Sequence, residues 1–201
     1  MSHVRFFHGS TEGPPVDVYF NDHMVASNLG HGQFTDYEEI EPGDYAASVY
    51  YSGMYGNPIY STSLSIPLGS IYTYGLSGLY PRMTLLPVSD SCELSAALNP
   101  MVRLVQLSYD LPVFDCYDED SLLWSGCGYG TTTSYSYIYP GIRTVYLYPA
   151  GTTISPYLTV PNVSLAPNSY YSFYTYGSPT SIGYPLRMHI PLDGHSYIHR
   201  R

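Results

Sequence analysis

The chain has 201 residues, with 16 acidic and 7 basic side chains, all seven of them Arg, and a net charge of −9. An acidic surface without basic clusters argues against nucleic acid and anionic membranes as partners. No apolar run approaches the roughly 18 to 20 residues of a membrane-spanning helix, so we expect no membrane insertion. The first residues show no charged segment followed by an apolar one, so we expect no signal peptide.

Short runs rich in β-branched and aromatic residues alternate with Gly, Pro, Asn and Asp along the whole chain. No segment repeats its apolar residues at the helical period of 3.6. This pattern predicts an all-β protein of the sandwich type with almost no helix. In the first half of the chain we expect strands over residues 3–8, 16–20, 24–29, 34–40, 45–51, 59–66, 70–75 and 82–86.

The beginning of the chain is repeated later in the sequence. Residues 4–43 align without a gap on residues 102–141, and the identical pairs include Arg5/Arg103, Ser10/Ser108, Asp17/Asp115, Tyr19/Tyr117 and Tyr37/Tyr135. Chance is a poor explanation for this register, so the chain contains two homologous units. The motif YTYG at residues 72–75 returns at residues 174–177, an offset of 102 instead of 98. This difference predicts a four-residue insertion between the fifth and seventh strands of the second unit.

The repeat also sets the expected domain boundaries. We expect one β-sandwich domain at residues 1–91 and a second at residues 101–194. Residues 92–100 form the expected linker between them, and residues 195–201 form a short C-terminal tail with few partners inside its own domain.

Several motifs resemble a bacterial domain known as domain of unknown function 4397. They are residues 4–10 (VRFFHGS), residues 15–19 (PVDVY) and residues 42–45 (PGDY), and the second unit matches less fully because Gln106 replaces the His. The ending at residues 190–197 is similar to that of some family members from spore-forming Gram-positive bacteria, which have two domains and no signal peptide. The resemblance implies tandem immunoglobulin-like antiparallel β-sandwich domains on a cell surface or envelope, and it brings no established catalytic residues.

His8, Ser10 and Asp17 are residue types that can form a catalytic triad. Ser10 and Asp17 recur in the second unit, but Gln106 replaces the His, so the second copy could not use the same mechanism. Ser and Asp beside Pro-rich turns are also natural partners for backbone amides. We therefore expect no catalytic residues and a protein that is not an enzyme.

Two further groups resemble metal sites. The acidic turn at residues 118–120 resembles part of a calcium loop, but its counterpart at residues 20–22 is a plain hairpin turn. His195 and His199 in the tail could bind a metal, although we favour a solvated pair. We therefore expect no metal site and no cofactor.

Three Cys residues are too few and too irregularly spaced for a disulfide framework or a zinc site. Cys116 and Cys127 take the repeat positions of Val18 and Leu29, so we expect both to be buried as small apolar side chains. Cys92 lies in the linker and is expected to be the accessible one.

Tyr is unusually frequent, with 25 residues, whereas only 11% of residues are charged. Strand propensity and half-buried packing explain much of this excess. The remaining rings suggest either subunit contacts or stacking platforms for sugars.

The hypothesis we favour is a non-enzymatic structural protein of a bacterial cell surface or spore outer layer that assembles with copies of itself into a fibre or layer. Sandwich edges and the tail would make the contacts, with Cys92, His195, Tyr197 and Ile198 as the expected assembly residues. The alternative is an adhesin-type module that binds cell-surface glycan or cell wall through exposed Tyr.

Overall fold

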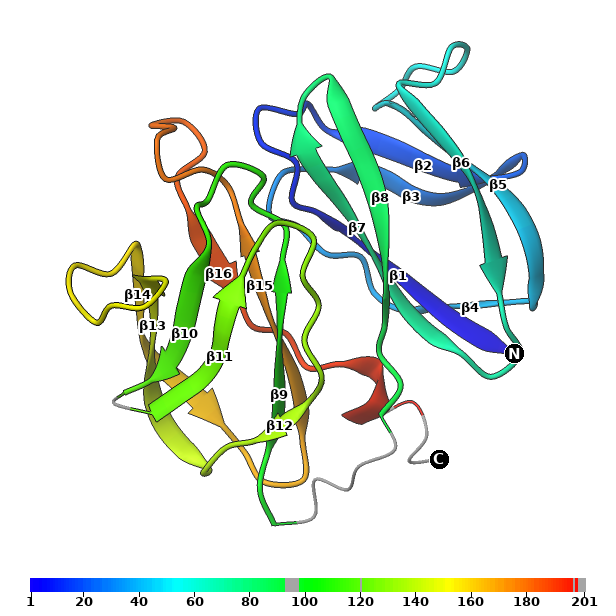
Figure 1. Cartoon of the computed structure of the whole chain (residues 1–201). Helices are drawn as coiled ribbons and strands as arrows, with labels where there is room; N and C mark the ends of the chain where they lie inside the picture. Colours follow the sequence, from blue (N-terminus) through cyan, green and yellow to red (C-terminus); the bar gives the residue numbers. More distant parts are fainter. Residues whose placement is uncertain (93–97, 120, 197, 199–201) are drawn as a thin grey trace. The chain divides into compact units, whose positions relative to one another are not determined.

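The computed structural model describes residues 1–92, 98–119, 121–196 and 198. The chain divides into two compact units, Met1–Ser91 and Cys92–Arg201, and each is built from β-strands in two sheets (Figure 1). The predicted fold class, a tandem of two β-sandwiches, is confirmed. The expected linker at residues 92–100 includes residues 93–97, which lie outside the described residues.

The first unit contains two four-stranded sheets, with the orders β4-β1-β7-β8 and β3-β2-β5-β6. Their strands are β1 (Ser2–His8), β2 (Val16–Phe20), β3 (His23–Leu29), β4 (Glu38–Ile40), β5 (Gly43–Tyr51), β6 (Tyr60–Ile66), β7 (Ile71–Leu79) and β8 (Arg82–Ser89). Most bounds agree with the sequence prediction within a few residues, because alternation and turn residues mark strand ends well.

The second unit repeats this topology with the sheet orders β12-β9-β15-β16 and β11-β10-β13-β14. Its elements are β9 (Met101–Gln106), β10 (Phe114–Asp118), β11 (Ser121–Cys127), β12 (Ser136–Tyr137), β13 (Gly141–Pro149), β14 (Leu158–Leu165), β15 (Tyr170–Tyr176), β16 (Arg187–His189) and the 3₁₀ helix η1 (Gly194–Ser196). In the described part of the chain, no helix is long and apolar enough to span a membrane.

Each unit contains one parallel strand pair among otherwise antiparallel neighbours. β1 pairs with β7 in the first unit, and β9 pairs with β15 in the second. Arg5 lies opposite Thr73 in the first pair, and Arg103 lies opposite Ser172 in the second. Thr73 of β7 therefore corresponds to Ser172 of β15, so the offset between these two strands is 99 residues.

The four-residue insertion is not where it was predicted. Before β15 only one extra residue enters, in β14, where Arg143 pairs with Val163 and Val145 pairs with Val160. Asn162 adopts a left-handed φ of 59° in this β-bulge. Four more residues enter between β15 and β16, since Thr175 pairs with Met188 where Leu76 pairs with Leu85 in the first unit. The YTYG motif was matched three positions out of register, because β15 has aromatic residues on both of its faces.

The predicted strand at residues 34–40 is shorter than expected. Phe34 stacks on Phe7 of β1 with ring centroids 4.2 Å apart, and the Thr35 N–H donates to the Phe6 carbonyl. The chain then leaves the ladder before re-entering it as β4. Tyr37 lies in this gap, where its hydroxyl reaches a buried carboxylate instead of continuing the strand.

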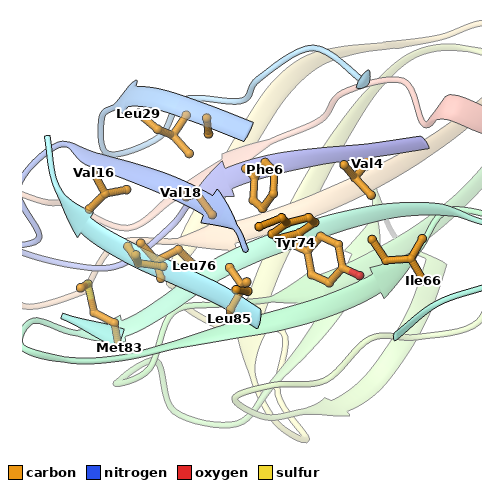
Figure 2. Close-up of a cluster of buried hydrophobic side chains, with 14 residues drawn as sticks. Val4, Phe6, Val16, Val18, Leu29, Ile66, Tyr74, Leu76, Met83 and Leu85 are labelled. Atoms are coloured by element: carbon orange, nitrogen blue, oxygen red, sulfur yellow. The ribbon is translucent and has the colours of Figure 1, made fainter. Parts of the chain in front are cut away.

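The first core lies between the two sheets, which contribute alternating side chains to it. Figure 2 shows these side chains directed toward one another from both sheets. Phe6 packs edge to face on Phe20 at 5.4 Å, and both rings contact Tyr74. In the second core, Trp124 meets Phe173 edge to face at 6.1 Å. Alternation along each strand explains this layering, since every second residue faces the same side.

The repeated Asp residues hold backbone amides at the same places in both units. In the first unit, Asp17 accepts from the N–H groups of Asn28 and Gly53 at 2.7 and 2.8 Å. In the second, Asp115 accepts from Gly126 and Gly151, both at 2.8 Å. The Asp17 carboxylate therefore joins β3 to the turn after β5, and the Asp115 carboxylate joins β11 to the turn after β13.

The pKa of Asp17 reflects the hydrogen bonds that its carboxylate accepts from the two amides. Desolvation alone would raise its pKa, but the hydrogen bonds from the Asn28 and Gly53 amides act in the opposite direction and the pKa is lowered. The ionised carboxylate is thus the form that the fold stabilises, which explains why an acid is needed at this position.

We predict that Asp115→Asn lowers the unfolding free energy of the second unit by about 1–3 kcal/mol, because an amide cannot accept from two N–H groups with both of its polar atoms. Fluorescence of Trp124, the only Trp in the chain, follows unfolding of this unit in urea. The control is Glu119→Gln, a half-exposed side chain expected to change stability by less than about 0.5 kcal/mol. Equal stability of both variants would contradict a stabilising role for the two hydrogen bonds to Asp115.

Candidate functional site

A buried polar network links distant segments of the first unit. Asp90 accepts hydrogen bonds from the hydroxyls of Thr73 and Tyr37 at 2.5 and 2.6 Å. Arg5 donates from Nε to Thr73 at 2.7 Å, and its guanidinium carbon lies 4.4 Å from the centre of the Tyr37 ring. Arg5, Thr73 and Asp90 are all buried. The network therefore has the closed hydrogen bonding that buried charges require.

The second unit contains the same network with one substitution. Asp193 accepts from Ser172 and Tyr135 at 2.7 and 2.5 Å, and Arg103 donates to Ser172 at 2.6 Å. The Arg103 guanidinium also lies 3.8 Å from Asp193. Because both copies keep it, the network serves the fold. Sequence analysis missed it, although the repeated Arg5/Arg103 and Tyr37/Tyr135 pairs were a usable signal.

His8, Ser10 and Asp17 each bond to the main chain. Ser10 donates to the Gly78 carbonyl at 2.9 Å, and its repeat partner Ser108 donates to the Gly177 carbonyl at 2.6 Å. His8 Nε2 lies 3.1 Å from the Pro14 carbonyl oxygen. These are the turn-supporting roles that the sequence suggested for Ser and Asp, and this geometry does not couple the three side chains into a nucleophile and base.

His8 is fully buried in the first unit, where Gln106 stands in the second. The pKa of His8 is lowered from 6.5 to about 4, chiefly by burial; the hydrogen bond to Pro14 opposes this shift and the nearby His31 adds to it. His8 is therefore neutral at pH 7. Gln106 meets the same need without a titrating group, since its Oε1 accepts from Thr175 at 2.6 Å and from the Ser108 amide at 2.9 Å.

The Cys residues occupy two kinds of environment. Cys116 and Cys127 are buried in the second core, as predicted. Burial raises the pKa of Cys127 to about 11 and that of Cys116 well above its ordinary value, so neither thiol ionises readily near neutral pH. Cys92 is half-buried and packs against a small cluster formed by Met101 and Tyr170.

The predicted tail is held to its own unit as far as Ser196. The His195 ring meets the Tyr170 ring edge to face at 4.5 Å, and Ser196 Oγ accepts from the Tyr170 N–H at 2.8 Å. Gly194 and Ser196 are buried within η1. The expectation of few partners is therefore wrong for this part, because it completes the start of β15. Ile198 is half-buried, and Tyr197 lies outside the described residues.

Cys92 and His195, two of the expected assembly residues, meet at the same place. Both pack on the cluster that contains Tyr170. As for the two groups whose sequences resemble metal sites, no group of three or more His, Cys, Asp or Glu is arranged for a metal within the described ranges. Asp120 of the acidic turn and His199 of the tail lie outside those ranges.

An ion pair distinguishes the second sandwich from the first. Asp118 accepts from Arg143 Nε at 2.9 Å and from its terminal nitrogen at 2.7 Å, and these hydrogen bonds raise the pKa of Arg143. The same positions in the first unit hold Phe20 and Tyr45, whose rings pack 5.4 Å apart. A charged pair thus replaces an aromatic pair at one end of the sandwich core.

A cavity of about 360 Å³ opens beside this ion pair in the second unit. Tyr137, Tyr139 and Leu122 line it together with Asp118 and Arg143. Three of these side chains, Leu122, Tyr137 and Tyr139, are exposed. Aromatic side chains and a paired guanidinium and carboxylate thus line one cavity, and such a combination can bind a small polar ring.

Comparison with known proteins assigns the chain to a family. The sequence profile of DUF4397, a domain of unknown function, matches residues 2–117 and again residues 100–186. The chain belongs to the DUF4397 family. The double match agrees with the two copies seen in the fold, and the two matched regions together cover most of both units. No curated protein is similar enough to this DUF4397 chain to count as a match.

We predict that the first unit loses stability as pH falls from about 6.5 to about 4. The folded state depresses the pKa of His8, so the unfolded state binds more protons in this window and unfolding is favoured by up to about 3 kcal/mol. Amide hydrogen exchange of the first unit's strands between pH 7 and pH 5, corrected for intrinsic exchange rates, would measure this slope.

The matched variants are His8→Gln, which copies the second unit, and His23→Gln, which changes an exposed His. We expect His8→Gln to flatten the pH slope and His23→Gln to leave it intact. An unchanged slope in His8→Gln would show that another group is responsible.

Proposed function

We propose that this chain is a non-enzymatic structural protein of a bacterial cell or spore surface, and that it assembles with copies of itself through an edge strand of its first sandwich. The surface location is supported by the resemblance of its motifs and ending to envelope proteins. The assembly is supported by the four features described next.

The observation that carries the proposal is the edge strand β6. It pairs with β5 over seven consecutive residues without a register shift, and its sequence, YSTSLSI, contains neither a charged residue nor Pro. An edge strand has backbone N–H and C=O groups without partners on its outer side, and monomeric proteins usually protect it with charges, Pro or bulges. β6 has none of these protections, so it offers a template for a strand of another chain.

The corresponding strand of the second unit is protected. β14 contains Pro161, which has no N–H to donate, and the bulge at Asn162 interrupts its pairing with β13. Both strands have the same place in the same topology. The open edge of β6 is therefore not a requirement of the fold, which supports a role for it in contacts between chains.

A hollow of about 440 Å³ adjoins β6 at the open side of the first sandwich. Ser63, Leu64 and Ser65 of β6 line it, together with Tyr72, Tyr74, Pro87 and Ser89 of β7 and β8. A strand added to β6 would direct every second side chain toward this hollow, because side chains alternate between the faces of a strand. The mixture of hydroxyls and rings suits small apolar or aromatic side chains.

The distribution of exposed Tyr also supports contacts with other copies. Among the described residues, the exposed rings belong to Tyr55, Tyr109, Tyr129, Tyr137 and Tyr139; Tyr137 lies in β12 and the others lie in several connections. A single concave sugar platform would gather such rings in one place. Tyr is enriched at protein interfaces, where charged residues are depleted.

We predict that Ser63→Lys prevents assembly. Ser63 is exposed on β6, so its replacement should not disturb the core, whereas a charge on an edge strand opposes pairing with another chain. Negative-stain electron microscopy and sedimentation velocity of the purified protein at increasing concentration would measure the outcome. The wild type is expected to form ordered assemblies, and Ser63→Lys is expected to remain monomeric.

Ser164→Lys is the matched control, because it adds the same charge to an exposed position of the protected strand β14. It should assemble like the wild type, which separates strand pairing from a general change in net charge. Assembly of Ser63→Lys at wild-type concentration, or a wild type that stays monomeric throughout, would refute the proposal.

A second candidate function is glycan binding, and the cavity beside Asp118 and Arg143 favours it. Tyr139 and Tyr137 could stack on the apolar face of a sugar while the ion pair bonds to its hydroxyls. A glycan array or a cell-wall pull-down tests this function. Retention by the wild type that Tyr139→Ala abolishes and Tyr109→Ala preserves would favour it, whereas no retention on any glycan would remove it.

A further inference from the structure

Two tyrosine rings form a corner on the first unit that a third ring fills. Tyr19 of β2 and Tyr50 of β5 meet edge to face, with centroids 5.4 Å apart and planes at 84°. Tyr55, in the loop after β5, stacks on Tyr50 at 5.1 Å and 28° and lies 5.3 Å from Tyr19. The nearby Tyr50, Asp22 and Tyr19 raise the pKa of Tyr55. The phenol ring of Tyr55 therefore shows which chemical group fits the corner between Tyr19 and Tyr50.

The second unit keeps the corner but lacks the third ring. Tyr117 and Tyr148, each 98 positions after its counterpart, meet edge to face at 5.6 Å and 86°. The position of Tyr55 is taken by Thr153. A cavity of about 340 Å³, lined by Tyr117, Glu119, Tyr148 and Thr153, lies where the ring would be expected.

The open corner has a smaller side chain at the equivalent position of a loop of the same length. The loops between the paired strands have the same length, residues 52–59 and residues 150–157. Each is anchored at the same position, since the amides of Gly53 and Gly151 donate to Asp17 and Asp115. Both loops are therefore anchored alike and the ring is missing from the second, in which Ser155 also adopts a left-handed φ of 53° that its counterpart Asn57 does not.

The corner of the second unit is prepared to receive a ring. Tyr146 stacks on Tyr148 at 5.6 Å and 18°, where the first unit has Ser48, so an additional aromatic contact fixes Tyr148. Rings held in place before binding lose little freedom when a ligand arrives. The carboxylate of Glu119 at the rim can accept a hydrogen bond from a phenol hydroxyl.

We propose that the open corner of the second unit binds a tyrosine side chain of a second copy of this chain. The incoming ring takes the position relative to Tyr148 and Tyr117 that Tyr55 takes relative to Tyr50 and Tyr19. The chain itself offers suitable donors, and Tyr139 is the most exposed of the described tyrosines at 73%. This inference rests on the proposed self-assembly and adds a second contact to it. A contact between a donor and a corner on different surfaces extends a fibre where the rotation between copies closes neither a dimer nor a ring.

Recognition of the ring is tested on the full chain with N-acetyl-L-tyrosine amide as the probe, by saturation-transfer NMR. Thr153→Tyr fills the corner as the first unit does, and Thr153→Val leaves it open with a side chain of similar size. We expect transfer to the probe ring from the wild type and from Thr153→Val, and less than about half of it from Thr153→Tyr. Equal transfer from all three proteins, or stronger transfer to methyl β-glucopyranoside, overturns the inference.

The source of the ring is tested by sedimentation of the same variants. Filling the corner should weaken self-association about threefold or more, the usual strength of one aromatic pair, while Thr153→Val associates like the wild type. If Thr153→Tyr assembles normally and Ser63→Lys does not, this inference fails and the proposed function stands. If the probe distinguishes the variants but no protein assembles, the proposed function fails, and the ring does not come from a second copy.

Discussion

One buried carboxylate in each unit holds together segments that are far apart in the sequence. An ionised Asp is unfavourable in a protein interior unless donors and a positive charge surround it. In the first unit, Thr73 of β7 and Tyr37 of the segment before β4 donate to Asp90, which directly follows β8. Arg5 of β1 supplies the positive charge and donates to Thr73. The parallel pairing of β1 with β7 and the break in the strand before β4 therefore satisfy the same group. Asp193 has this role in the second unit.

The two copies serve as controls for each other. Where they agree, as at Asp17 and Asp115 or at the buried carboxylates, the shared chemistry supports the sandwich. Where they differ, the sandwich does not require the difference. The edge strand, the third ring of the tyrosine corner and the pair at the end of the core all differ while the topology is unchanged. Functional surfaces are therefore best sought at these three places.

Much of the fold could be predicted because alternation and turn residues act locally. Val16–Phe20 was predicted with its observed bounds, and the repeat predicted a second sandwich of the same plan. Two of the errors share a cause, which is contact between distant segments. Tyr37 leaves its strand to reach Asp90, and His195 leaves solvent to pack on Tyr170. The misplaced insertion has another cause: aromatic residues on both faces of β15 allowed the YTYG motif to be matched three positions out of register.

The sequence by itself determined the all-β class, the tandem of two copies and the family, because each of these is carried by periodicity or identity along the chain. It also marked Asp17 and Ser10 as turn-supporting residues. Only the tertiary structure decided that Asp118 meets Arg143 where the first unit packs two rings, and that Thr153 leaves a cavity beside Tyr148. These features depend on which side chains meet across strands, and a repeat alignment compares equivalent positions without specifying their neighbours.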